Sequence, residues 1–76
     1  MKPYFTAIIE KEDDMYVALC PEVDIASQGY SIEEAKSNLK EAVELFFEYA
    51  SESEIHNRLH YDVYISPLEV NIGQIA

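Results

Sequence analysis

Hydrophobic and polar residues alternate with a period of two over much of the first 30 residues, which is the pattern of β-strands. Residues 4–10 and 16–20 are rich in aromatic and β-branched side chains, and they flank a wholly charged stretch at 11–14. This arrangement predicts a β-hairpin. A weaker third strand is predicted over residues 24–28, closed by Gly29, whose backbone can adopt conformations that other residues resist.

The period changes to 3.6 after Ser31, which predicts an amphipathic helix. Ser31 and Glu34 have the spacing of a capping box, in which Ser31 accepts from the backbone NH three residues on and Glu34 reaches back to the NH of Ser31. The helix is expected to end between Tyr49 and Glu54. Its predicted inward stripe consists of apolar residues three or four apart: Ile32, Ala35, Leu39, Ala42, Val43, Phe46 and Ala50.

Alternation returns in residues 61–72 and predicts a fourth strand, bent or broken at Pro67. Its apolar positions are Tyr61, Val63 and Ile65, then Leu68, Val70 and Ile72. The expected order is β-β-β-α-β, with the helix as the crossover between parallel strands. We therefore predict an α+β fold, with a small mixed sheet and one helix on one face. At 76 residues the chain is too short to fill two cores, so a single domain over 1–76 is expected.

The first two predicted strands carry large apolar groups on both faces, although one helix can cover only one face. The second face is covered either by another protein surface, or by residues 68–76 or a helical turn at 55–59 folding back over it. We favour association, because a short tail shields only part of a sheet face. Self-association as a homodimer or higher oligomer is expected.

Fifteen acidic residues against five basic ones give a net charge of -10. Such a surface repels nucleic acid phosphates and attracts basic proteins, or it serves only to keep a small domain soluble. No apolar run reaches 18 residues and no signal peptide is recognisable, so no membrane association is expected and the predicted location is cytoplasmic. Cys20 is the only cysteine, which excludes an internal disulfide.

The sequence offers little for catalysis. His56 and His60 stand four apart, as in some zinc sites, but no third ligand accompanies them, and surface or packing roles are the better interpretation. The predicted strand centres lack the carboxylates of a two-metal nuclease, Cys20 has no evident base, and no glycine-rich phosphate loop exists. We expect no enzymatic activity, no metal and no cofactor.

The acidic residues of the predicted turns are the candidate contacts for a basic partner. They are Glu12, Asp13 and Asp14 in the hairpin turn, and Glu22 and Asp24 after the second strand. The alternative is that these are ordinary solvated turns, in which Asp is common in any case.

Residues 16–29, which read YVALCPEVDIASQG, together with 31–35 and 38–42, resemble the HicB family of antitoxins. The resemblance implies a partial ribonuclease H-like fold that lacks the metal-binding carboxylates of that enzyme. It also implies a partner, the HicA-type toxin, a small basic ribonuclease that cuts mRNA and whose catalytic histidine the antitoxin shields. We expect a short form without a DNA-binding domain. Tyr30 replaces an acid that is usual in the family, so an orphan interaction or ligand-binding domain without a toxin remains the alternative.

Overall fold

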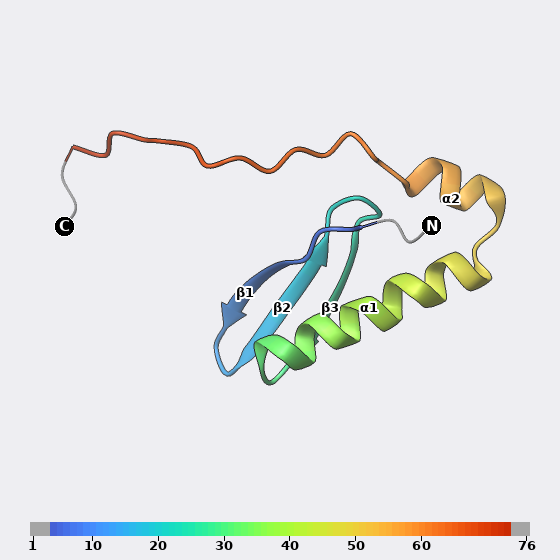
Figure 1. Ribbon diagram of the computed structural model, residues 1–76. Coiled ribbons are helices and arrows are strands. Elements are labelled where there is room, and N and C mark those ends of the chain that lie inside the picture. The colour runs from blue at the N-terminus through green and yellow to red at the C-terminus, as the bar shows by residue number, and fades with distance from the viewer. Residues whose placement is uncertain (1–3, 74–76) are drawn as a thin grey trace.

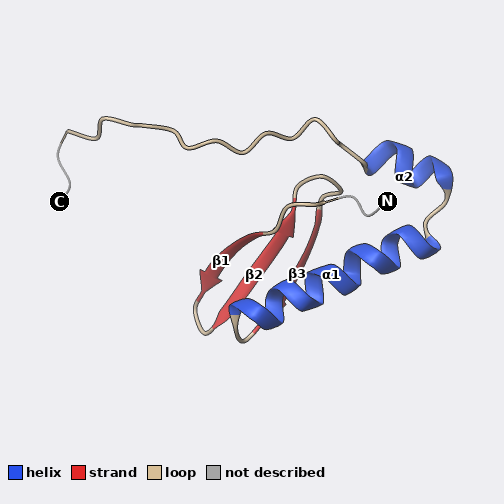
Figure 2. Cartoon of the chain, viewed as in Figure 1, coloured by secondary structure: helices blue, strands red, loops and turns tan. Residues whose placement is uncertain are grey.

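The computed structural model describes residues 4–73 and contains one small sheet and two helices. The elements follow in the order β1 (Ile8–Glu12), β2 (Met15–Cys20), β3 (Ile25–Gly29), α1 (Ile32–Tyr49) and α2 (Glu52–Arg58). The three strands form an antiparallel sheet in the order β1-β2-β3, and α1 crosses one face of it (Figures 1 and 2). The predicted α+β class and the β-β-β-α order are confirmed.

The register of the strands decides which side chains meet α1. Ile8 pairs with Leu19, and Leu19 pairs with Ala26, so these three residues share one face of the sheet. Ala18 and Cys20 alternate with Leu19 and point to the other face, where both are buried beneath α1.

The core lies between this face and the inward stripe of α1. Its buried members are Ala18, Cys20, Val23, Ala35, Leu39 and Val43. Three members of the predicted stripe are thus buried and a fourth, Phe46, packs against the core, whereas Ile32 is 49% exposed because it lies in the first helical turn, immediately after the chain reversal that follows β3. Phe47 packs against the core although the sequence analysis did not assign it there.

Gly29 is required for a reason other than the one predicted. Its φ is not positive, but a Cβ at this position would lie 2.6 Å from the backbone nitrogen of Ala35. The absence of a side chain therefore lets the end of β3 approach the first turn of α1 closely.

Both helices begin with a capping serine. The Ser31 hydroxyl accepts from the Glu34 amide at 3.0 Å, and the Glu34 carboxylate accepts from the amide of Tyr30, one residue before the predicted donor. Ser51 accepts in the same way from the amide of Glu54, which starts α2. The sequence suggested only a helical turn at 55–59, whereas α2 covers Glu52–Arg58, and Ser51 and Glu54 repeat the capping-box spacing.

The predicted fourth strand does not form within the described chain. Residues 59–73 belong to no strand, and beyond Tyr61 the chain extends away from the sheet (Figure 1), so the sheet is antiparallel throughout rather than mixed. The extended segment raises the radius of gyration to 15.2 Å. A compact chain of this length would have about 11 Å. Alternation of apolar and polar residues shows that a segment can form a strand, but it does not show whether a sheet edge is available for that strand to pair with.

Among residues 4–73, no helix has both the length and the apolar character needed to span a membrane.

Candidate functional site

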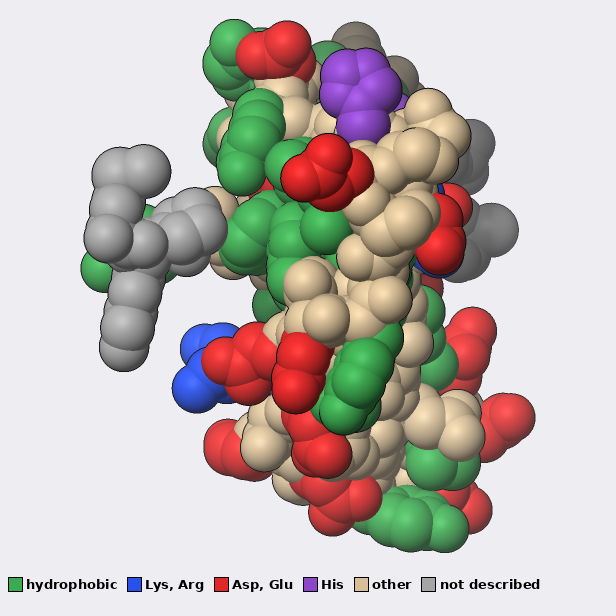
Figure 3. Space-filling view, turned by 90° about the vertical axis from the view of Figure 1, so that its right-hand side faces the viewer, with side chains coloured by type: hydrophobic (Ala, Val, Ile, Leu, Met, Phe, Trp, Pro, Cys, Tyr) green, Lys and Arg blue, Asp and Glu red, His purple; other side chains and the backbone are tan. Residues whose placement is uncertain are grey.

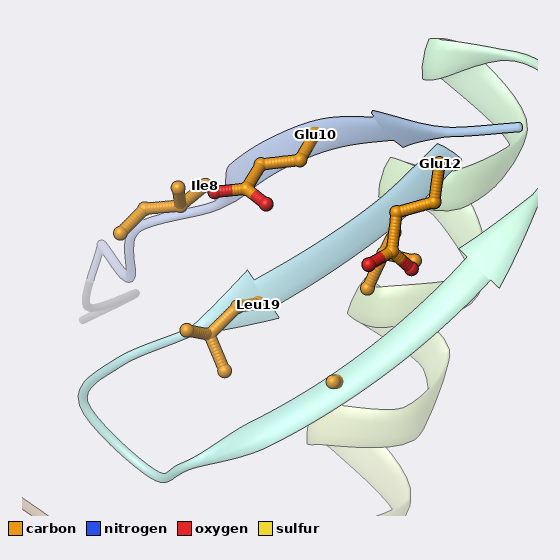
Figure 4. A pocket seen from close by; sticks show the side chains of 6 residues that line it. Ile8, Glu10, Glu12 and Leu19 are labelled. Carbon is orange, nitrogen blue, oxygen red and sulfur yellow. The ribbon is translucent and has the colours of Figure 1, made fainter. Parts of the chain in front are cut away.

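The sheet face opposite α1 is uncovered, and we call it the open face. Residues from all three strands line a shallow hollow on it: Ile8, Glu10, Glu12, Val17, Leu19 and Ala26 (Figure 4). Neither α2 nor residues 59–73 contribute to this lining, so the fold-back predicted as an alternative does not cover the hollow within the described chain. Apolar side chains and two carboxylates therefore share an accessible surface.

The open face continues into the β1-β2 turn. A second hollow shares Glu12 and Val17 with the first and is also lined by Asp13, Asp14, Met15, Gln28 and Tyr30. Four acids at successive or alternate positions, Glu10, Glu12, Asp13 and Asp14, thus border the apolar residues along β1 and its turn. We call these four residues the acidic rim.

Local backbone geometry explains the position of the rim. The turn contains only Asp13 and Asp14, because Glu12 pairs with Met15. Asp13 has a φ of 54°, in the left-handed region that Asp and Asn tolerate better than most residues. The strand therefore continues two residues further than predicted, and this places Glu12 on β1 together with Glu10.

Glu10 was not among the predicted contact residues. The predicted strand covered residues 4–10 and the contact acids were expected in the turns, whereas β1 covers Ile8–Glu12. The signal was available in the sequence, because Ile8, Glu10 and Glu12 are separated by two positions and must share a face in any extended strand.

Glu22 must be removed from the set of predicted contact residues. It is only 7% exposed, and its carboxylate accepts from the Thr6 amide at 2.9 Å, from the Thr6 hydroxyl at 2.5 Å and from the Cys20 thiol at 3.3 Å. These bonds hold the segment before β1 against the β2-β3 turn. The residue has a structural role inside the protein, because its acceptor oxygens are already engaged.

The two buried titratable groups affect each other. Burial alone would raise the pKa of Glu22, but hydrogen bonds from the Thr6 side chain and backbone, from its own amide and from Cys20 together leave that pKa below its usual value. Burial, the hydrogen bond to Glu22 and the nearby carboxylate charge raise the pKa of the Cys20 thiol. Cys20 therefore remains a protonated thiol and a poor nucleophile at neutral pH.

Asp24 lies at the other end of the sheet from the acidic rim. It has a φ of 54°, its side chain is exposed, and its carbonyl accepts from the Arg58 guanidinium at 2.6 Å. The six residues of β2 separate the two turns by about 17 Å. Of the five predicted contacts, only Glu12, Asp13 and Asp14 lie together.

Acidic side chains are also spread over the face of the molecule shown in Figure 3, where few basic ones are visible. The chain as a whole has a net charge of -10. The field of the protein is therefore negative beyond the rim, and the rim differs from the remaining acids by its contact with an apolar surface.

The two histidines do not share a helical face. His56 lies in α2, whereas His60 follows the C-cap residue Leu59. Within residues 4–73, no group of three or more His, Cys, Asp or Glu side chains is placed to hold a metal ion.

Two curated proteins are similar to this chain over most of their own length. UPF0150 protein ssl0738 of Synechocystis sp. is 52% identical over 50 residues, which cover 63% of this chain and 69% of the relative. A UPF0150 protein of Helicobacter pylori is 37% identical over 65 residues, 84% of this chain and 90% of the relative. No family model and no solved structure matches the chain. From these two relatives, the chain belongs to the UPF0150 family.

Proposed function

We propose that this protein is a non-enzymatic, cytoplasmic antitoxin of the HicB type, which binds a basic HicA-type mRNA-cleaving toxin and masks its active site. The observation that carries the proposal is the open face, where an apolar hollow is bordered by the four carboxylates of the acidic rim. The resemblance of residues 16–29 to HicB antitoxins supplies the identity of the partner.

The composition of this surface suits a basic protein partner. Ile8, Val17 and Leu19 provide apolar area that is buried on association, as in the centre of a protein interface. The rim offers carboxylates to Arg or Lys side chains, which a ribonuclease needs in order to bind RNA. A surface that occupies those cations competes directly with the RNA substrate.

The same residues argue against catalysis by the antitoxin itself. Glu10 and Glu12 are two carboxylates on a single strand, and a two-metal site normally collects more ligands from several elements. The buried Cys20 thiol, with its raised pKa, is not activated for nucleophilic attack.

A second candidate function is an interaction domain that binds a different basic protein. Tyr30 favours this candidate, because it lines the hollow at the hairpin end where the HicB family usually has an acid, and it is 73% exposed. An aromatic side chain at that position alters the contacts available to a toxin.

The decisive experiment uses the protein encoded next to this chain's gene, which the proposal expects to be small and basic, co-expressed and purified as a complex. The rim variant carries Glu10→Gln, Glu12→Gln, Asp13→Asn and Asp14→Asn, and Asn at position 13 retains tolerance of the left-handed conformation. The control variant neutralises four exposed acids of α1, Glu33, Glu41, Glu44 and Glu48, and so has the same net charge.

At low salt, the rim variant should associate at least about tenfold more slowly than the control, since rim charges mainly steer association. Wild-type protein should also stop RNA cleavage by the partner. Equal rates for the two variants would mean that net charge alone attracts the partner. Binding without inhibition of RNA cleavage would favour the interaction domain over the antitoxin.

A further inference from the structure

The segment that follows α2 is extended and rich in apolar residues, and most of its side chains are exposed to solvent. Tyr64 and Leu68 are 89% and 85% exposed, and Val70 and Ile72 are 63% and 64% exposed. We call residues 62–73 the arm. Single exposed apolar residues are ordinary, but a continuous series of them on an unpaired extended backbone is typical of a segment that binds another surface.

The origin of the arm is fixed on the body of the protein. The His60 amide donates to the Glu22 carbonyl at 2.6 Å, and the Tyr61 ring stacks on Phe5 with 6.5 Å between centroids. The arm therefore leaves beside the segment that enters β1. From there it extends away from the sheet, and the molecule measures 49 × 29 × 21 Å along its principal axes.

The two edges of the sheet differ in their readiness to accept a strand. At β3, Asn38 of α1 donates to the Gln28 carbonyl at 2.8 Å, and α1 lies against this strand. The backbone of β1 makes no hydrogen bond outside its ladder with β2 among residues 4–73. β1 is thus the free edge, and the nearby Phe5, Ile9 and Phe47 side chains are only partly buried.

The outer part of the arm matches this edge in length. Pro67 has no NH to donate and interrupts any ladder, which leaves residues 68–72 as a possible strand of five residues. β1 also has five residues. Leu68, Val70 and Ile72 share one side of such a strand, while Glu69 and Asn71 occupy the other.

We propose that residues 68–72 add to the free edge of β1 in a second copy of this chain, and that two copies exchange their arms reciprocally. The occupant is a second copy because the arm runs past its own β1 without pairing with it and extends beyond the sheet (Figure 1), where another copy can reach it. Strand addition satisfies the unpaired backbone groups of both segments, and the exchange of identical elements gives a closed two-fold dimer. The surface used is the sheet edge, which leaves the acidic rim available.

The charge of the chain predicts how this dimer responds to salt. Each copy has a net charge of -10, so two copies repel each other, and added salt screens the repulsion. Self-association should therefore strengthen with salt. Binding of a basic partner to the rim should weaken over the same range of salt concentration. The opposite salt dependences allow a failure of the dimer proposal to be told apart from a failure of the antitoxin proposal.

The test measures the mass of the full chain by sedimentation velocity across the micromolar range. We expect a concentration-dependent dimer that Val70→Asp weakens at least about tenfold, since a charge would enter the apolar side of the exchanged strand. Asn71→Asp is the matched control, because it adds the same charge to the other side of the arm, and it should change the dissociation constant less than about threefold.

A cross-link identifies the surface. In the Glu10→Cys/Val70→Cys variant, a short bis-maleimide should produce a covalent dimer at protein concentrations where the wild type is dimeric. A purely intramolecular cross-link would mean that the arm folds onto its own β1 and would overturn the proposal. A monomer at every concentration and salt level, or equal effects of Val70→Asp and Asn71→Asp, would also overturn it.

Discussion

Glu22 connects segments that are distant in sequence through a single carboxylate. Thr6, 16 residues away, donates both its amide and its hydroxyl to it, and the Cys20 thiol donates as well. No periodicity in the sequence identifies such a pair, because Glu22 follows Pro21 in an acidic stretch that has the composition of a solvated turn. Its burial could be learned only from the tertiary structure.

Replacing Glu22 with Gln should destabilise the protein by about 1 to 3 kcal/mol at neutral pH, because a charged acceptor of several hydrogen bonds is lost. The pKa of Glu22 is lowered in the folded state, so its contribution to stability is present above the ordinary carboxyl pKa and is lost as the pH falls through the folded value. Urea unfolding should show the difference between wild type and variant narrowing below about pH 4. A constant difference at all pH values would refute the role of the charge, and the exposed Glu44→Gln serves as the control.

Gly29→Ala should destabilise the protein by about 1 to 3 kcal/mol, because the added methyl group meets backbone atoms of Glu34 and Ala35 that cannot move independently of α1. Ala26→Ser, at an exposed position of the same strand, should have little effect. Thermal unfolding compares the two variants. Equal unfolding temperatures for the two variants would show that α1 can move to accommodate the methyl group with little loss of stability.

At the level of the elements, short-range patterns were sufficient for the sheet and α1. The hairpin, the third strand and the Ser31 cap each depend on neighbours within a few residues, and all three formed with boundary shifts of at most four residues. The fourth strand would need a neighbouring strand to pair with, and the sequence of residues 61–72 does not show whether one is within reach. For the candidate site, the hairpin acids were predicted, whereas the connection of Glu10 to them depended on β1 extending as far as Glu12.

Arg58 links α2 to the rest of the fold. Its guanidinium donates to the Asp24 carbonyl and lies 5.3 Å from the centre of the Phe46 ring. Arg58→Ala should increase hydrogen exchange in α2 by at least about tenfold while protection in β2 changes little, since local opening of α2 does not require global unfolding. Lys40→Ala on the exposed face of α1 is the control, and unchanged exchange in α2 would show that Leu59 packing alone retains the helix.

At the scale of the whole molecule, the fold separates three regions in space. The hydrogen-bonded β2-β3 turn at one end holds the segment before β1, α2 and the origin of the arm together. The acidic rim lies at the opposite end, and the free edge of β1 runs between them. The composition indicated an acidic chain and the pattern of the first two strands indicated a sheet with one uncovered face, but the positions of the rim and the free edge depend on this arrangement.

The extended arm also has a consequence for the lifetime of the protein. An unpaired, exposed chain is the form that proteases cleave, and pairing as a strand protects it. Chymotrypsin should cut at Tyr64 or Leu68 rapidly in dilute solution and at least about fivefold more slowly where copies are paired, while Tyr16 in β2 resists under both conditions. Mass spectrometry of the fragments checks this, and a cleavage rate independent of protein concentration would contradict it. A chain with this property disappears fastest when it is scarce, so its abundance would fall abruptly once synthesis stops.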